Sequence, residues 1–130
     1  MRKYAMSMTA LIFLIPVFGL GQGSMGLQEK ISEALQGKHR TEAELARDED
    51  RAPMAALDFI GLRDDMTVIE FLPAAQAYYT KILGPVLVEN GHLWTVDNSN
   101  TFSGWGEWTT EPEFEMTHQV AIDNNYSRAE

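Results

Sequence analysis

The sequence contains no cysteine among its 130 residues. This absence excludes disulfide bonds, zinc sites with thiolate ligands, a thiol nucleophile and a lipid-modified cysteine at an export site. It does not indicate a compartment, because a chain without thiols is compatible with oxidising and with reducing surroundings.

Basic residues are scarce, with 10 lysines and arginines against 19 aspartates and glutamates, so the formal net charge is -9. A surface with this excess of negative charge repels phosphate backbones, and we therefore expect no nucleic acid partner. The hydrophobic content of 45% is ordinary for a globular protein. A chain of this length is expected to form one domain with a single core.

The N-terminal segment has the layout of a secretory signal peptide. Two basic residues precede an apolar run over residues 10–20, and small residues that include Gly21 and Gly23 follow it. The run is shorter than the roughly 20 residues that span a bilayer. We expect residues 1–23 to be cleaved near these glycines, which makes the product exported, periplasmic or secreted, with membrane contact only through this segment. An uncleaved anchor and a buried helix are the alternatives.

Residues 24–65 are predicted to form a charged helical arm. Apolar residues recur at helical spacing from Leu27 to Leu35, and a glycine follows. Thr41 can cap a second helix, because a glutamate stands three positions later. A third helix is expected over residues 52–62, with a proline in its first turn and a glycine at its exit. The charged cluster at residues 47–51 is interpreted as a solvated stretch or, alternatively, as a positioning element over a site.

Residues 66–97 are predicted to form a strand, a helix and a second strand. "MTVIEFL" at 66–72 is a nearly continuous apolar run, which is typical of a parallel strand covered on both faces. A helix is expected over residues 75–87, kinked or ended at its glycine-proline pair, and a strand over 92–96. This is one βαβ unit with a right-handed crossover.

The pattern fades after residue 98, where only residues 118–122 could form a further short strand. "FSGWGEW" at 102–108 is interpreted as a loop whose rings fill an incomplete core, with carbohydrate stacking as the alternative. The histidines and aspartates lack a recognisable ligand spacing, so no metal site is predicted.

A set of motifs over residues 39–97 matches the pattern of a known family. A charged "HR…RD…R.P" segment precedes a helix ending in "F.G", followed by "MTV.E", a proline and "YT.IL.P". The matching residues are Arg40, Arg47, Asp48, Arg51, Pro53, Phe59, Gly61, Met66, Thr67, Val68, Glu70, Pro73, Tyr79, Thr80, Ile82, Leu83 and Pro85. This stretch resembles exported bacterial proteins described as predicted class I methyltransferases. The resemblance implies an α/β fold, a partial Rossmann-like class I methyltransferase unit over residues 66–130 with an incomplete sheet and an irregular tail.

The resemblance also implies a cofactor, S-adenosylmethionine, and an acceptor, an unidentified small molecule or protein. The implied cofactor-binding residues are Glu70, Pro73, Ala74, Ala75, Gln76 and Asp97. Glu70 would accept hydrogen bonds from the cofactor or the loop backbone, and Asp97, after the second strand, would accept the ribose hydroxyls. Without the resemblance, Glu70 is a strand residue and Asp97 a turn residue. No catalytic side chain is implied, since the sulfonium already activates the methyl group.

Two departures from the family pattern leave the activity open. Residues 74–77 read "AAQA" where the family has mostly glycine, so this segment is either the start of a helix or a weakened cofactor loop. The later strands of a complete enzyme have no recognisable counterpart. The alternative function is therefore a non-catalytic exported binding or assembly module, or a truncated remnant of a methyltransferase. A two-stranded parallel sheet would leave open edges, through which a homodimer could form.

Overall fold

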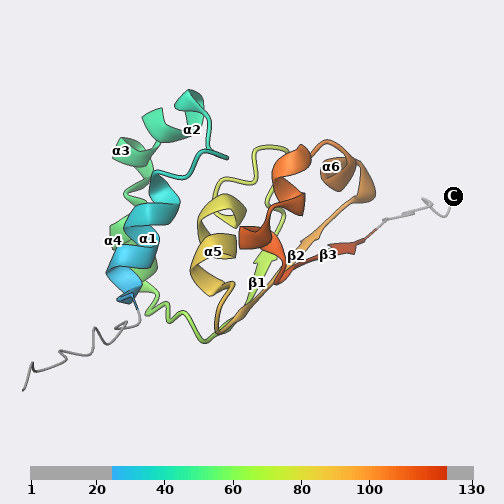
Figure 1. The fold of residues 1–130 in the computed structure, drawn as a ribbon. Helices are drawn as coiled ribbons and strands as arrows, with labels where there is room; N and C mark the ends of the chain where they lie inside the picture. Colours follow the sequence, from blue (N-terminus) through green and yellow to red (C-terminus); the bar gives the residue numbers. More distant parts are fainter. Residues whose placement is uncertain (1–24, 123–130) are drawn as a thin grey trace, which may run out of the picture.

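The computed structural model describes residues 25–122, so the predicted signal peptide lies outside the described part (Figure 1). The elements are α1 (Leu27–Leu35), α2 (Glu42–Ala46), α3 (Asp48–Arg51), α4 (Pro53–Phe59), β1 (Thr67–Phe71), α5 (Thr80–Leu87), β2 (His92–Asp97), α6 (Ser99–Ser103), the 3-10 helices η1 (Glu107–Thr110) and η2 (Pro112–Phe114), and β3 (Thr117–Ala121). Within residues 25–122 no helix has the length and apolar character needed to cross a membrane.

The helical arm forms where the sequence predicts it. The capping box at α2 is present, because the Glu44 backbone N–H donates to the Thr41 hydroxyl and the Thr41 N–H donates to the Glu44 carboxylate over 2.7 Å. Pro53 lies in the first turn of α4, and Gly61 follows that helix with a φ of 68°. These local signals therefore fix the ends of the arm helices.

The sheet has three parallel strands in the order β1-β2-β3. The α/β class is confirmed, whereas the expectation of two strands is wrong, because the short strand considered at residues 118–122 pairs with β2 as β3. Helix α5 makes the crossover between β1 and β2. The strands are in register, so that Ile69, Trp94 and His118 form one row across the sheet.

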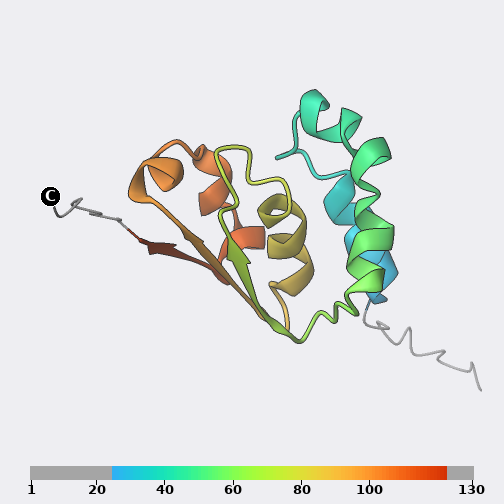
Figure 2. The same ribbon diagram turned by 180° about the vertical axis from the view of Figure 1, so that it is seen from behind.

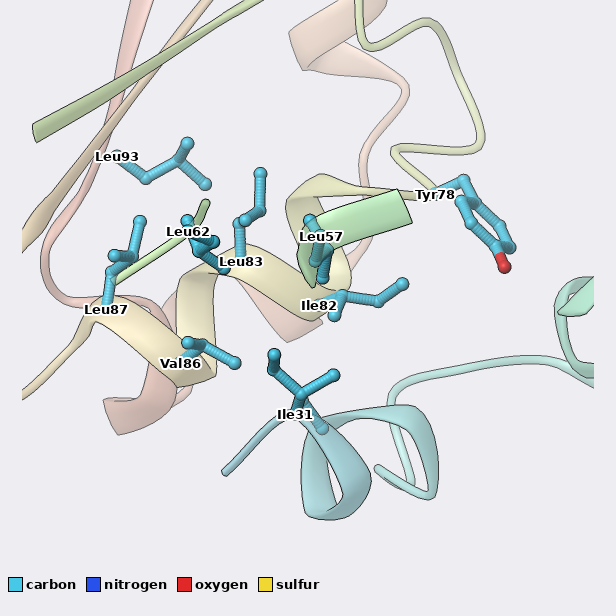
Figure 3. Close-up of a cluster of buried hydrophobic side chains, with 10 residues drawn as sticks. Ile31, Leu57, Leu62, Tyr78, Ile82, Leu83, Val86, Leu87 and Leu93 are labelled. Atoms are coloured by element: carbon cyan, nitrogen blue, oxygen red, sulfur yellow. The ribbon is translucent and has the colours of Figure 1, made fainter. Parts of the chain in front are cut away.

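The molecule is layered, with α5 between the sheet and the arm helices (Figures 1 and 2). Figure 3 shows the core that joins these layers: Leu93 of β2 lies above Leu87 of α5, and Val86, on the other side of α5, points toward Ile31 of α1. All four side chains are fully buried. The expectation that β1 is covered on both faces is wrong, because α5 and the arm lie on one side of the sheet.

Helix α5 differs from its predicted bounds at its start, because it begins at Thr80 rather than at residue 75. It ends at Leu87, the last residue of the predicted range, and so continues through Pro85, where a kink or an end was expected. Pro85 has no N–H to donate to the carbonyl oxygen of Lys81, four residues earlier. That oxygen lies 2.7 Å from Nε2 of His39, which can donate in its place. A contact from the arm thus satisfies the acceptor that proline leaves open.

The segment without a sequence pattern is folded up to residue 122. Trp105 and Phe114 are 8% and 2% exposed. The ring of Trp108 lies between them, with centroid distances of 5.2 Å to Trp105 and 4.8 Å to Phe114. Within residues 102–108 Trp105 is therefore buried, as expected of a ring that fills space in the fold, whereas the expectation of a loop is wrong at both ends of the segment, which belong to α6 and η1.

Candidate functional site

A cavity of about 570 Å³ lies where β1 ends and the following loop begins. Its walls come from β1, the loop, α3 and α4, and the start of α5. This volume is in the range of small-molecule sites, about 300–1,000 Å³. Four of the predicted cofactor-binding residues line it, namely Glu70, Pro73, Ala74 and Gln76.

The loop that follows β1 holds alanine in conformations that favour glycine. Ala74 and Ala77 have φ angles of 60° and 49°, and Leu72 has a φ of 55°. The interpretation of residues 74–77 as the start of the helix is therefore wrong, since a right-handed helix requires negative φ. The left-handed region costs an L-residue about 1–2 kcal/mol. The loop therefore follows a backbone path that is typical of glycine, although it contains no glycine.

Asp97 and Trp105 hold this loop from the side of β2. The Ala74 N–H donates to Oδ2 of Asp97 over 3.1 Å, and the Trp105 indole N–H donates to the Ala74 carbonyl over 3.1 Å. Oδ1 of Asp97 accepts from the Asn98 N–H over 2.7 Å and from the Thr101 hydroxyl over 3.0 Å. Asp97 is 3% exposed, and burial raises the pKa of its carboxyl, but the N–H donors outweigh burial and keep this pKa below its usual range.

Two of the predicted residues do not line the cavity. Ala75 and Asp97 lie outside its wall, although Ala75 is in the same loop and Asp97 contacts that loop. The ribose role of Asp97 stays a prediction. Trp105 was not predicted as a site residue, and its only sequence signal is its place in the aromatic segment 102–108.

Glu70 lies on the α5 side of β1, at the cavity wall. Its carboxylate accepts a hydrogen bond of 2.7 Å from the Thr80 hydroxyl at the start of α5. Burial raises the pKa of Glu70, and the hydrogen bonds from Thr80 oppose that effect without cancelling it. Glu70, which was predicted to contact the cofactor, therefore has a carboxylate with no lysine or arginine among its contacts.

The arm supplies the opposite wall with Arg47 and Arg51, and Tyr78, from the segment between β1 and α5, also lines the cavity. The Arg51 guanidinium lies 4.6 Å from the centroid of the Tyr78 ring, and the Tyr78 hydroxyl donates to Asp48. Burial, followed by the contact with Asp48, raises the pKa of Tyr78 to about 12, so its hydroxyl stays protonated. Of the two interpretations of residues 47–51, these contacts favour the positioning element over the solvated stretch.

Comparisons of the chain with protein families, with curated proteins and with solved structures found no match. Among residues 25–122, no group of three or more histidine, cysteine, aspartate or glutamate side chains is placed to hold a metal ion.

Glycine at Ala74, an exposed position, is expected to stabilise the protein by about 0.5–1 kcal/mol, because relief of the left-handed backbone exceeds the added freedom of the unfolded chain. Glycine at Ala77 should gain less, because the Ala77 methyl group is fully buried and its removal costs about 0.8 kcal/mol. Ala75→Gly is the matched control in the same loop. Ala75 has no positive φ, so this change is expected to destabilise by about 0.4–1 kcal/mol. Urea unfolding measures all three, and a loss of stability in Ala74→Gly would contradict the described loop.

Proposed function

We propose that this protein binds S-adenosylmethionine as a class I methyltransferase-like protein with a partial Rossmann-like fold. The observation that carries the proposal is the cavity at the carboxyl end of β1, bordered by a left-handed loop. Ligands of open parallel sheets bind outside the carboxyl ends of the strands. In such a loop the backbone can come close to a ligand. Ala74 and Gln76, both predicted for this role, line that cavity.

The charges on the cavity wall suit the two ends of the cofactor's amino acid. Glu70 lies on one wall and can accept from an ammonium group, while Arg47 and Arg51 lie on the other and can donate to a carboxylate. Tyr79 presents an aromatic ring between them, which is attractive to a sulfonium cation. These residue types therefore fit S-adenosylmethionine.

Bound S-adenosylmethionine would supply an activated methyl group. The residues of this chain would then orient the donor and exclude water, since methyl transfer requires mainly that donor and acceptor lie in line. The acceptor, a small molecule or a protein, would approach past the exposed side chain of Leu72, which is 68% exposed at the cavity. Export through residues 1–23 is part of the same proposal.

The test is calorimetric titration of S-adenosylmethionine into the product of the full chain, after its intact mass has shown whether residues 1–23 are removed. We expect a Kd on the order of micromolar. Ala56→Trp places a large ring in the cavity without touching the loop and is expected to weaken binding about tenfold or more. Ala55→Trp, on an exposed neighbouring position of α4 outside the cavity, should bind like the unmodified protein.

A second candidate function is the non-catalytic binding or assembly module. Phe59 and Ile60, at the end of α4, are 90% and 64% exposed beside the cavity, and apolar side chains exposed together favour a protein contact. A folded protein that gives no heat with millimolar S-adenosylmethionine would exclude the cofactor proposal and leave this one. If Ala56→Trp and Ala55→Trp weaken S-adenosylmethionine binding equally, that result would also count against the cavity as the binding site.

A further inference from the structure

The face of the sheet that points away from α5 carries an ordered set of side chains without any aspartate, glutamate, lysine or arginine. The register places these residues on it: Thr67, Ile69, Phe71, His92, Trp94, Val96, His118 and Val120. We call this set the open face. Ile69, Phe71 and Trp94 are 58%, 68% and 40% exposed. Among the described residues, no helix covers this side of the sheet (Figures 1 and 2).

The centre of the open face is held by ring contacts. The rings of Trp94 and His118 lie 4.5 Å apart between centroids, and those of His92 and His118 are stacked at 5.8 Å. Ile69 stands in the same row as Trp94 and His118, on the neighbouring strand. These side chains form a continuous aromatic and aliphatic surface over all three strands, rather than scattered exposed residues.

The charge distribution indicates what can cover this surface. None of the eight open-face residues is an aspartate, glutamate, lysine or arginine, although the chain has a formal net charge of -9. Two copies of so acidic a chain repel each other over most of their surfaces, but not where two open faces meet. Anionic membranes and nucleic acids are repelled by the acidic chain and find no lysine or arginine on this face. A surface that is complementary to itself favours an isologous contact.

We propose that a second copy of this chain covers the open face, so that two sheets pack face to face about a twofold axis. Parallel sheets in α/β proteins are normally covered on both faces. Packed sheets lie about 10 Å apart with interdigitated side chains, and Trp94 on the central strand supplies the largest such side chain. This dimer differs from pairing through the open edges of the sheet, which remains a prediction from the sequence.

The inference does not depend on the cofactor. Ile69 and Phe71 of the open face also line the cavity, but Trp94, His118 and Val120 do not, so variants at these three positions leave the lining of the proposed binding site unchanged. Failure of the dimer would therefore not count against S-adenosylmethionine binding, and absence of cofactor binding would not count against the dimer.

Sedimentation equilibrium of the purified product of the full chain tests the proposal. We expect a dimer at a protein concentration of about 50 µM. Trp94→Glu brings two carboxylates into the contact, and like charges in an interface cost several kcal/mol, so association is expected to weaken about 100-fold or more. His118→Glu is the second variant, and the circular dichroism spectrum of each variant establishes that it remains folded.

Phe59→Glu is the matched control, because this side chain is 90% exposed on α4 and away from the open face. It should dimerise like the unmodified protein. A protein that stays monomeric at about 500 µM would overturn the proposal. So would a dimer unchanged in both sheet variants, a dimer lost equally in Phe59→Glu, or a mass that corresponds to a complex with another protein instead of a second copy.

Discussion

Asp48→Asn is expected to lower the free energy of unfolding by about 3 kcal/mol. The Arg40 side chain is fully buried, and Asp48 receives two hydrogen bonds from its guanidinium, of 2.6 and 3.0 Å. Removal of one partner leaves the other as a buried charge without compensation, which typically costs about 3–5 kcal/mol. The lower end applies here, because the Asp48 side chain is 26% exposed.

The pH dependence of this effect has a definite sign. The hydrogen bonds from Arg40 hold the pKa of Asp48 below its usual range. The contribution of Asp48 is therefore present above the pKa of an aspartate in the unfolded chain, about 3.9, and is lost as the pH falls through the folded pKa. The difference in stability between the parent protein and Asp48→Asn should be largest at neutral pH and should shrink in acid.

Asp50→Asn is the matched control for this prediction. Asp50 is an exposed aspartate of the same short helix, α3, and its replacement should change stability by less than about 0.5 kcal/mol. Urea unfolding at pH 7 and at pH 3 compares the two variants. If both variants lose stability equally, the charge of the arm matters and the contact with Arg40 does not.

The contact between Asp48 and Arg40 also affects the cavity wall. Asp48 accepts from Tyr78 as well as from Arg40, so it links the arm to the loop that follows β1. Arg51, which lines the cavity, packs on the Tyr78 ring. Loss of Asp48 should therefore loosen the wall that the arm provides.

The elements that the sequence predicted correctly are those with short-range signals. The capping box at Thr41 and the turn at Gly61 depend on residues within three or four positions, and both are present. The apolar run of β1 and the strand from His92 are also present. The βαβ unit could be predicted because each of these elements has a hydrophobic pattern of its own along the sequence.

The errors concern contacts between segments far apart in the sequence. A kink or an end of the helix at Gly84-Pro85 is a sound local expectation, but His39, 42 positions before Lys81, can donate to the Lys81 carbonyl that Pro85 leaves without a donor. Alanine at residues 74–77 favours a helix locally, whereas hydrogen bonds to Asp97 and from Trp105 fix a left-handed loop. The apolar run of β1 does not reveal that one of its faces is open, because burial depends on which elements lie opposite.

Asp97→Ala is expected to destabilise the protein by about 3 kcal/mol or more. The change leaves at least two backbone N–H donors, of Ala74 and Asn98, without their carboxylate acceptor. Hydrogen bonds to a charged group are worth about 1.5–3 kcal/mol each, and the buried Asp97 carboxylate accepts at least three. The loop that borders the cavity would lose one of its two anchors, the other being the Trp105 indole.

This expectation decides how the binding experiment must be interpreted. A loss of S-adenosylmethionine binding in Asp97→Ala could result from the altered loop as well as from a missing ribose contact. The variant Asp58→Ala removes an exposed aspartate of α4 and should change stability by less than about 0.5 kcal/mol. Urea unfolding of both variants is therefore needed before any titration. If Asp97→Ala proves as stable as Asp58→Ala, the carboxylate does not anchor the loop, and a loss of cofactor binding would then indicate direct contact with the ribose.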